Sequence, residues 1–317
     1  MDSSNCADKT AFAVKHRSES VRMASRSGGV FTALSDVILN QGGIVYGVRL
    51  DEDLEAVHAR ADTKEIRDTF RGSKYVQSRI GSAYADCEED LRDGKTVLFS
   101  GTPCQIDGLK NYLKAKGAPT ERLITIEILC HGVPSPRVVR DYIEYVGKGE
   151  KVSSVEFRDK VKFGWKDHAE TLRIGEKEVS SRQLAVLFLG HNTTRSSCFH
   201  CPYKRVERYA DITIGDFWGI EELDKKFDDN KGVSLLLLHS EMGKHLFEQA
   251  VSDLDVEEFP LSNSMQPVLC ENYKEPGSRA QFWKDYETMP FSGIVRKYGV
   301  DRVQAAKRMV KKLLGRV

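Results

Sequence analysis

The sequence predicts an α/β (α+β) fold in which helices flank a mixed sheet. Two short apolar segments, 96–100 and 123–129, each end in a turn that leads into a helix-like run. A third segment, Val30–Asn40, carries apolar residues at helical spacing. Strands that alternate with helices along the chain in this way are typical of a sheet with parallel neighbours.

The first half of the chain alternates expected helices and strands. Ser27 and two glycines precede the helix predicted over Val30–Asn40, and another pair of glycines ends it. The other elements expected in this half are a strand at 44–50, a strand at 56–61 and a helix with Ile80, Tyr84, Cys87 and Leu91 on one face. We therefore place Cys87 in the core.

The second half mixes strands and helices without an internal repeat. Strands are expected at 154–158, 169–174, 212–214 and 234–239. A short polar run with two glycines, 147–151, is a plausible division between the halves. We expect an amino-terminal tail over 1–24, a catalytic domain over 25–262 and a mostly helical extension over 263–317. The basic helix from 291 onward suits packing on its own domain, or binding to a membrane surface.

The balance of charges narrows the class of protein. Lysine and arginine total 48 against 47 aspartate and glutamate residues, so no global field attracts nucleic acid. The amino-terminal segment lacks the apolar core of a signal peptide, and no apolar run approaches the roughly 20 residues of a membrane-spanning helix. We expect a cytoplasmic protein without an integral membrane segment. Its seven cysteines then favour metal binding or redox chemistry over disulfides.

Two of the cysteines lie where predicted strands end. Cys104 and Cys130 each follow one of the two short apolar strands, in turns that contain glycine. If these strands are parallel neighbours, their carboxyl ends share one edge of the sheet, where open α/β sheets bind ligands. We therefore expect Cys104 and Cys130 to converge.

Two further cysteines form a C-x-x-C pair. Cys198 and Cys201 have the spacing that lets two thiolates bind one metal or cluster, and a proline follows them as in bacterial ferredoxin motifs. With Cys104 and Cys130 they supply the four thiolates that an iron–sulfur cluster requires. Zinc would use the same four residues, and a reversible dithiol would use the pair alone. The cysteines expected in the core or as inert thiols are Cys6, Cys87 and Cys270.

Six blocks of the sequence stand in a recognisable order. They are Ser27-Gly28-Gly29-Val30-Phe31-Thr32, Arg71-Gly72-Ser73-Lys74-Tyr75-Val76-Gln77-Ser78, Gly101-Thr102-Pro103-Cys104-Gln105, Cys130-His131-Gly132, Cys198-Phe199-His200-Cys201 and Asp211-Ile212-Thr213-Ile214-Gly215-Asp216-Phe217-Trp218-Gly219. Together these blocks resemble the coenzyme F420 hydrogenase/dehydrogenase beta subunit family. The resemblance runs from about residue 25 to about residue 255.

The resemblance implies a flavoprotein in which FAD lies beside a cluster held by Cys104, Cys130, Cys198 and Cys201. Such proteins pass electrons between a ferredoxin-like protein or reduced coenzyme F420 and a small-molecule substrate, which varies within the family. Many relatives carry an amino-terminal ferredoxin-like module, whereas only Cys6 precedes residue 25 here. We therefore expect one [4Fe-4S] cluster and an external electron donor.

The resemblance also implies roles for residues outside the cysteines. The amides before the first helix suit the FAD pyrophosphate, although the same turn serves as an ordinary helix cap. Lys74 suits a negative flavin or substrate group, although its block also reads as an ordinary polar strand. The residues expected to bind cofactors are Ser27, Gly28, Gly29, Thr32, Ser73, Lys74, Tyr75, Gln77, Ser78, Thr102 and Gln105, and those expected at catalytic positions are Lys74, His131 and Asp216.

The predicted function is therefore that of an FAD-dependent iron–sulfur oxidoreductase. Two alternatives stay open. One is a cofactor-free dithiol oxidoreductase that uses Cys198 and Cys201, and the other is a structural or regulatory metal-binding protein. The expected partners are a ferredoxin-like protein or reduced F420 and a small molecule, and a homo-oligomer is compatible with the sequence.

Overall fold

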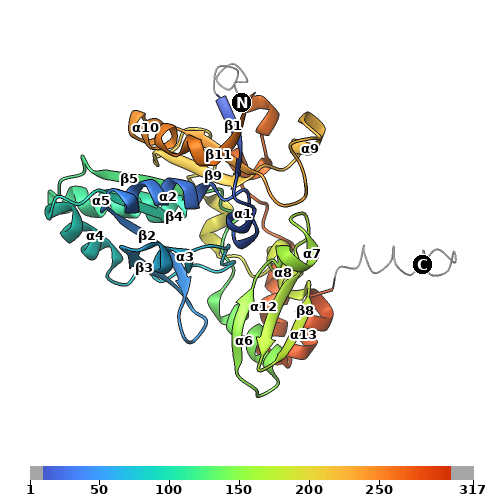
Figure 1. Cartoon of the computed structure of the whole chain (residues 1–317). Helices are drawn as coiled ribbons and strands as arrows, with labels where there is room; N and C mark the ends of the chain where they lie inside the picture. The colour runs from blue at the N-terminus through green and yellow to red at the C-terminus, as the bar shows by residue number, and fades with distance from the viewer. Residues whose placement is uncertain (1–9, 301–317) are drawn as a thin grey trace.

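The structure, a computed structural model, describes residues 10–300 of the chain. It contains a mixed eight-stranded sheet and a separate three-stranded sheet, with helices around both (Figure 1). The strand order is β11-β1-β10-β9-β5-β4-β2-β3 in the large sheet and β6-β7-β8 in the small one. The predicted α/β fold with a mixed sheet and flanking helices is confirmed.

The bounds of the elements are as follows. The strands are β1 (Thr10–His16), β2 (Ile44–Leu50), β3 (Ala56–Ala61), β4 (Val97–Gly101), β5 (Leu123–Ile128), β6 (Val152–Glu156), β7 (Glu170–Ile174), β8 (Lys177–Ser181), β9 (Ile212–Asp216), β10 (Ser234–Leu238) and β11 (Leu254–Pro260). The α-helices are α1 (Glu19–Ala24), α2 (Val30–Asn40), α3 (Lys64–Asp68), α4 (Ala83–Arg92), α5 (Pro103–Lys116), α6 (Pro136–Gly147), α7 (Lys160–Phe163), α8 (Gln183–Leu189), α9 (Ile220–Leu223), α10 (Glu241–Ala250), α11 (Pro267–Cys270), α12 (Arg279–Thr288) and α13 (Phe291–Tyr298). Short 3-10 helices are η2 (Ser196–His200), η3 (Val251–Asp253) and η4 (Leu261–Ser264).

Four adjacent strands of the large sheet run parallel. β2 pairs with β4, β4 with β5, and β5 with β9, so their carboxyl ends share one edge of the sheet. β4 and β5 are the strands that precede Cys104 and Cys130. We expected Cys104 and Cys130 to converge if their strands are parallel neighbours. β4 and β5 are parallel neighbours in the structure.

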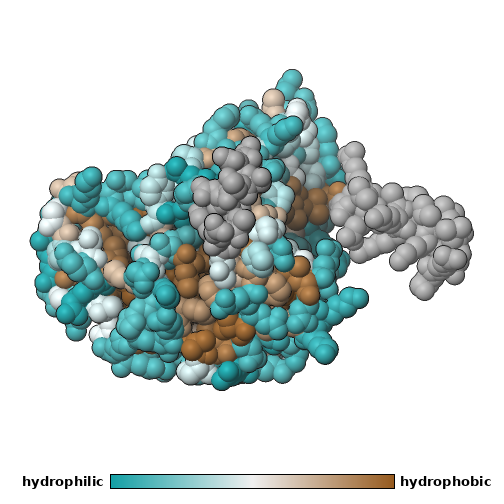
Figure 2. Space-filling view, turned by 90° about the horizontal axis from the view of Figure 1, so that it is seen from above, coloured by the Kyte–Doolittle hydropathy of each residue, from teal (hydrophilic) through white to brown (hydrophobic). Residues whose placement is uncertain are grey.

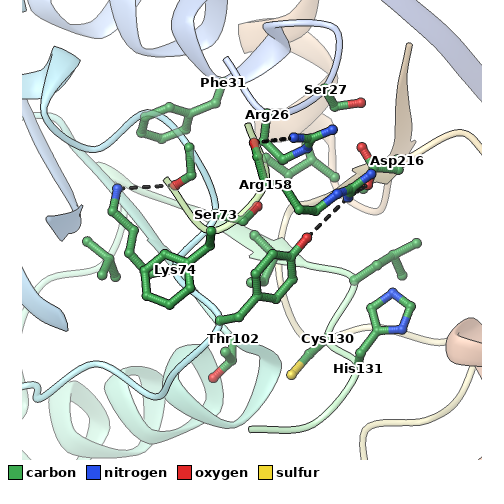
Figure 3. Close-up of a pocket in the computed structure, with 18 of the residues that line it drawn as sticks. Arg26, Ser27, Phe31, Ser73, Lys74, Thr102, Cys130, His131, Arg158 and Asp216 are labelled. Carbon is green, nitrogen blue, oxygen red and sulfur yellow. Dashed lines mark hydrogen bonds and ion pairs between the residues drawn. The ribbon is translucent and has the colours of Figure 1, made fainter. Parts of the chain in front are cut away.

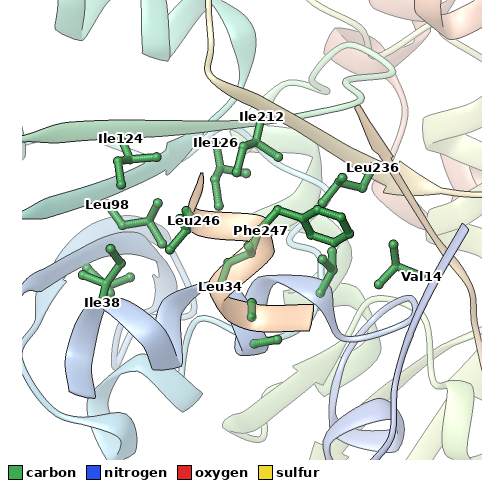
Figure 4. Packing of buried hydrophobic residues seen from close by; sticks show 14 of the residues in the cluster. Val14, Leu34, Ile38, Leu98, Ile124, Ile126, Ile212, Leu236, Leu246 and Phe247 are labelled. Carbon is green, nitrogen blue, oxygen red and sulfur yellow. The ribbon is translucent and has the colours of Figure 1, made fainter. Parts of the chain in front are cut away.

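Helices cover both faces of the large sheet. α2 and α10 pack on one face through a cluster that includes Leu34, Phe247 and Ile126 (Figure 4). α4 and α5 cover the opposite face, where Cys87 is fully buried as predicted. On the face seen in Figure 2, hydrophilic residues cover most of the surface and apolar residues gather in patches between them.

Local sequence explains why α5 begins directly after β4. The Gln105 side chain reaches back and accepts a hydrogen bond from the Thr102 amide at 3.0 Å, as in a capping box. Pro103 occupies the first turn, where a missing amide costs nothing, and Gly117 ends the helix in a left-handed conformation with φ 58°. These contacts fix Cys104 in the first turn of α5.

The amino-terminal segment contributes a strand to the large sheet. β1 pairs antiparallel with β10 on one side and with β11 on the other, and Ala11, Ala13 and Val14 are fully buried. We predicted an amino-terminal tail over 1–24, but residues 10–24 form a strand of the sheet, β1, and the short helix α1. β1 was not predicted because no turn signal bounds it in the sequence and both of its partners lie far along the chain.

A smaller unit is inserted between β5 and β9. It combines α6, β6, β7, β8 and α8 with α12 and α13, and its core contains Val138, Val155 and Phe282. Residues on both sides of 147–151 enter this core, so that run is a turn inside the unit and does not divide two halves. The helices predicted after residue 263 are present, but α12 and α13 complete this unit instead of extending from the molecule (Figure 1).

No helix within residues 10–300 combines the length and the apolar character that crossing a membrane requires. Cys6 and residues 301–317, which hold most of the predicted basic helix, lie outside the described residues.

Candidate active site

A cavity of about 300 Å³ lies between the large sheet and the smaller unit. Its strand-end wall consists of residues 100–102, 128–132 and 214–216, at the carboxyl ends of β4, β5 and β9, together with the loop 25–32 before α2. Its inserted wall consists of Phe157, Arg158, His168 and residues 184–189, all from the smaller unit. Loop 70–78 closes a third side. The edge where open α/β sheets bind ligands is thus the edge that bears the cavity.

Most of the predicted site residues come together here, and a few do not. Those that line the cavity are Ser27, Gly29, Thr32, Ser73, Lys74, Tyr75, Ser78, Thr102, Gln105, Cys130, His131 and Asp216. Those outside its lining are Gly28, Gln77, Cys104, Cys198 and Cys201. Figure 3 shows side chains from both walls around the common space.

The strand-end wall presents the amino terminus of α2 to the cavity. Gly29 is the N-cap in a left-handed conformation with φ 89°, and Arg71 donates to the Thr32 hydroxyl at 3.2 Å. Within residues 10–300, no acceptor bonds the amides of Val30 and Phe31, the first two of the helix. Unpaired amides at a helix start, with a guanidinium beside them, favour an anionic ligand.

Gly28 has a packing role instead of a place in the cavity. A Cβ at this position would lie 2.1 Å from the Val14 carbonyl oxygen and 2.7 Å from the Ser234 amide. Gly28 also accepts a hydrogen bond from the His16 amide at 2.7 Å. It therefore lets the loop before α2 pass between β1 and β10, which positions Gly29 and the helix start.

Lys74 holds the loop that carries it. Its ammonium group donates to the carbonyl oxygens of Phe70, Arg71 and Gly72 at 3.0, 2.9 and 3.1 Å. Burial lowers the pKa of Lys74 to about 8. A lysine that is engaged in this way shapes the cavity through the loop, and its charge contributes to the potential there.

A chain of polar side chains runs behind the strand-end wall to Cys104. His58 Nε2 lies 3.1 Å from the Ser100 carbonyl oxygen, so this nitrogen donates and Nδ1 accepts from the Ser78 hydroxyl at 2.9 Å. Gln105 then donates to the Ser78 hydroxyl at 3.0 Å, and Thr102 donates to the Gln105 carbonyl. The Thr102 hydroxyl lies 3.2 Å from the Cys104 sulfur. Gln105 and Ser78 therefore support Thr102 beside a predicted ligand. By contrast, the side-chain oxygen of Gln77 is buried and has no hydrogen-bond partner in the described part of the chain.

The four predicted ligands lie near one another in pairs beside the strand-end wall. Cys104 is exposed, and Cys130, Cys198 and Cys201 are partly buried. Burial raises the pKa of the Cys130 thiol to about 12, and the neighbouring sulfurs of Cys104 and Cys198 add to the rise. Burial also raises the pKa of Cys198, to which Cys201 and Cys104 contribute. Cys104 thus lies close enough to Cys130 and Cys198, and Cys201 close enough to Cys198, to affect the pKa of those two thiols.

The backbone around these thiols provides hydrogen bonds to sulfur. Gly132 bonds the Cys130 sulfur and Val133 bonds the Cys198 sulfur, and both bonds favour the thiolate. Gly132 adopts φ 90°, and a Cβ there would lie 3.4 Å from the Cys198 Cβ. Hydrogen bonds to sulfur are one means by which proteins tune iron–sulfur clusters.

The spacing of the thiols bears on the kind of metal that they could hold. Among residues 10–300, no group of three or more histidine, cysteine, aspartate or glutamate side chains is close enough to hold one metal ion. Zinc binds thiolates at about 2.3 Å and so needs four closely gathered sulfurs. A four-iron cluster holds its thiolates further apart, because each binds a different iron. Four cysteine thiolates with amide hydrogen bonds to sulfur are the donor set that such a cluster takes.

The inserted wall contributes a buried ion pair that was not predicted from the sequence. Arg158 at the end of β6 donates to Asp216 at 2.8 Å and to the Tyr75 hydroxyl at 3.1 Å. Trp165 donates to the other oxygen of Asp216 at 2.9 Å. Burial acts to raise the pKa of Asp216, but Arg158 and Arg26 outweigh it and hold that pKa below its usual value. Asp216 therefore joins the two walls as a carboxylate.

His131 lies next to Cys130 and is held by a residue from the carboxyl-terminal part of the chain. Its Nδ1 lies 2.8 Å from the Tyr273 hydroxyl, and the two rings stack. Burial lowers the pKa of His131 to about 4, with Lys204 adding to the effect. His131 is thus a neutral ring with one nitrogen engaged by Tyr273.

Comparisons with known proteins identify the family and support the fold. A sequence model that describes the carboxyl-terminal part of the beta subunit in the coenzyme F420 hydrogenase/dehydrogenase family matches residues 94–264, which is more than half of the 317 residues. Among solved structures, a chain of the xenon-derivatised F420-reducing [NiFe] hydrogenase complex from Methanosarcina barkeri superposes with a TM-score of 0.56 at 17% identity, over 81% of this chain and 84% of that one. At this identity the likeness shows the fold alone. No curated protein sequence matches the chain.

Proposed function

The chain belongs to the coenzyme F420 hydrogenase/dehydrogenase beta subunit family, and on this premise we propose that it is an FAD-dependent iron–sulfur oxidoreductase. It passes electrons between an external donor, which is a ferredoxin-like protein or reduced F420, and a small molecule in the cavity. The observation that carries the proposal is the position of Cys130, which lines the cavity and interacts with Cys104 and Cys198. A group held by these thiols would border the space in which a substrate binds.

Separate parts of the site would hold the two cofactors. Cys104, Cys130, Cys198 and Cys201 would hold the cluster. The unpaired amides at the start of α2, with Arg71 beside them, would hold the FAD pyrophosphate. When bound, the cluster supplies single-electron transfer and FAD supplies two-electron chemistry.

The chain's own residues then orient the reactants and keep the site in shape. The Arg158–Asp216 pair fixes the inserted wall against β9, so that the two walls keep their separation. Tyr75 packs against Phe157 and Phe188 and makes the apolar side of the cavity. His131 lines the cavity beside Cys130, where its neutral ring is a candidate to hold or donate a proton.

Anaerobic purification followed by an absorbance spectrum and by iron, sulfide and flavin assays tests the proposal. We expect about four iron and four sulfide per chain together with FAD. A colourless protein that stays free of iron and flavin after reconstitution would contradict it. The dithiol alternative predicts that Cys104→Ser keeps its activity, whereas our proposal predicts that this variant loses its iron.

A further inference from the structure

We propose that Arg26 and Arg158 form a subsite for an anionic group, a carboxylate or a phosphate, on the small substrate. The inference rests on the proposed function for the role of the cavity as a substrate site. It extends that function by naming the charge of the substrate and the side chains that bind the charged group.

The charges in the cavity are not balanced. The basic residues that line it are Arg26, Arg71, Lys74 and Arg158, and the one acid among its lining residues is Asp216. His131 and His168 add no charge near neutral pH, since burial lowers the pKa of each to about 4. A cavity with this excess of cations attracts an anion, and its partly buried setting strengthens the attraction.

Among residues 10–300, Arg26 is the arginine of this group that has no acidic hydrogen-bond partner. Its two terminal nitrogens donate to the carbonyl oxygens of Arg158 and Trp165 at 2.7 and 2.8 Å. These carbonyls orient the guanidinium without cancelling its charge, and its Nε is buried with no hydrogen-bond partner among residues 10–300. Burial lowers the pKa of Arg26 to about 10 and Arg158 adds to the effect, while Asp216 and, less strongly, Tyr75 and Glu156 oppose it.

Arg158 brings the second guanidinium to the same place. Asp216 neutralises the charge of Arg158, and the Tyr75 hydroxyl accepts a hydrogen bond from it. The Arg158 Cζ atom lies over the Trp218 ring, 5.2 Å from the ring centroid. Asp216 therefore supplies one negative charge beside the two positive charges of Arg26 and Arg158. Figure 3 shows Arg26, Arg158 and Asp216 together on one side of the cavity, with Lys74 on the opposite side of the view.

The subsite is separate from the place that we assign to the FAD pyrophosphate. Arg71 lies at the first turn of α2, where it bonds Thr32 and pairs with Asp68 at 2.8 Å. Arg26 instead bonds backbone of the smaller unit, at Arg158 and Trp165. An anion on the Arg26 side lies near Asp216, which lines the same cavity as His131 and Cys130. That is the side of the cavity next to Cys130.

Calorimetric titration of the purified holoprotein with benzoate, and with its neutral analogue benzamide, tests the inference. The flavin content of every sample is measured separately. Benzoate is the probe because it joins a carboxylate to a ring that suits the apolar wall at Phe157 and Phe188. We expect the wild type to bind benzoate at least about tenfold more tightly than benzamide, because the carboxylate gains charge-assisted hydrogen bonds.

Two variants of Arg26 and two control variants show whether a change in benzoate affinity comes from the Arg26 guanidinium or from a loss of flavin. Arg26→Gln should raise the Kd for benzoate at least about tenfold and leave flavin content unchanged, while Arg26→Lys should keep most of the affinity. Arg71→Gln should lower flavin retention without changing the benzoate affinity of the flavin-loaded fraction. Arg17→Gln, an exposed arginine paired with Asp255, should change neither.

Three outcomes overturn the inference. They are equal affinity of the wild type for benzoate and benzamide, the absence of benzoate binding, and wild-type benzoate affinity in Arg26→Gln. Loss of flavin in Arg26→Gln with unchanged benzoate affinity assigns the guanidinium to the flavin phosphates and also overturns it. If the wild type holds no flavin but its benzoate binding still requires Arg26, the proposed function fails while the subsite stands.

Discussion

The strand-end wall and the inserted wall reach the same cavity by different routes. The strand-end wall is made of short blocks that directly follow strands, and parallel pairing of β4, β5 and β9 brings these blocks together. The inserted wall depends on a unit whose core draws on α6, α8, α12 and α13, from distant parts of the chain. The difference shows that the first wall is determined mainly by local backbone and sheet register. The second is determined by packing and by its ion pair with β9.

The largest expected effect concerns the group proposed beside the strand-end wall. Cys104→Ser should abolish binding of iron and sulfide, because a serine hydroxyl does not replace the thiolate in the first turn of α5. Iron and sulfide assays on anaerobically purified protein measure this, and FAD content should be largely retained since Cys104 does not line the cavity. The matched control is Cys270→Ser, which should keep its iron. Iron retained in Cys104→Ser and lost in Cys270→Ser would mean that the ligand set is different.

The next effect concerns the link between the walls. Arg158→Gln leaves Asp216 buried without its cation, and the two side chains are only 2% and 15% exposed. We expect the free energy of unfolding to fall by about 3–5 kcal/mol.

Urea denaturation measures this loss, with Arg17→Gln as the control. Arg17 and Asp255 are 60% and 52% exposed, so breaking that pair should cost less than about 1 kcal/mol. Equal losses in the two variants would show that the Arg158–Asp216 pair does not hold the inserted wall in place.

A somewhat smaller effect tests the backbone of the strand-end wall. Gly28→Ala places a methyl group 2.1 Å from the Val14 carbonyl oxygen, so strands or loop must shift, at a cost of about 3 kcal/mol. Gly277→Ala is the control, because no atom lies within 4 Å of the added Cβ. Thermal unfolding compares the two variants with the wild type. Wild-type stability in Gly28→Ala would mean that this passage between β1 and β10 is not tightly packed.

The smallest effect, for a change of one pH unit, is a dependence of stability on pH. Burial lowers the pKa of His58 to about 4 from its ordinary value of 6.5. Between these values the unfolded chain binds the extra proton and the folded chain does not, so stability is lost as pH falls from 6.5 towards 4. One such group contributes about 1.4 kcal/mol per pH unit.

Denaturation at a series of pH values from 7 to 4 measures that slope in the wild type and in His58→Gln. The variant should show a shallower slope. His245→Gln, which changes an exposed histidine of α10, should leave the slope as it is in the wild type. An unchanged slope in His58→Gln would show that His58 is already protonated in the folded protein at mildly acidic pH.

The two walls also differ in how much of them the sequence predicts. α2, β2 and β3 have the predicted bounds, because apolar periodicity marks each element and glycines stand before α2 and between α2 and β2. Site residues in the strand-end wall stand in recognisable blocks, so most of the predicted cofactor residues line the cavity. β1 escaped prediction since its partners are distant in sequence.

The inserted wall offers no comparable signal. Arg158 ends a strand that alternates polar and apolar residues, and in sequence it reads as a surface arginine. It is buried in the structure because it follows β6 at a point where Asp216, at the end of β9, accepts its hydrogen bond. Arg26 likewise becomes a cavity residue through backbone carbonyls of the smaller unit. The sequence predicted a catalytic position for Asp216 but no partner for it. The cofactor roles of all these residues stay predictions.

The position of β1 has a consequence for how the protein is made. β1 emerges early during translation, yet both of its sheet partners, β10 and β11, are synthesised more than two hundred residues later, on the order of 10–40 s at typical ribosome speeds. Until then Gly28 has neither β10 to pack against nor the Ser234 hydroxyl that accepts from its amide. The loop before α2 therefore takes its final shape only after β10 has left the ribosome. Any ligand that needs the final shape of this loop has to wait for β10, however early its own contact residues are made.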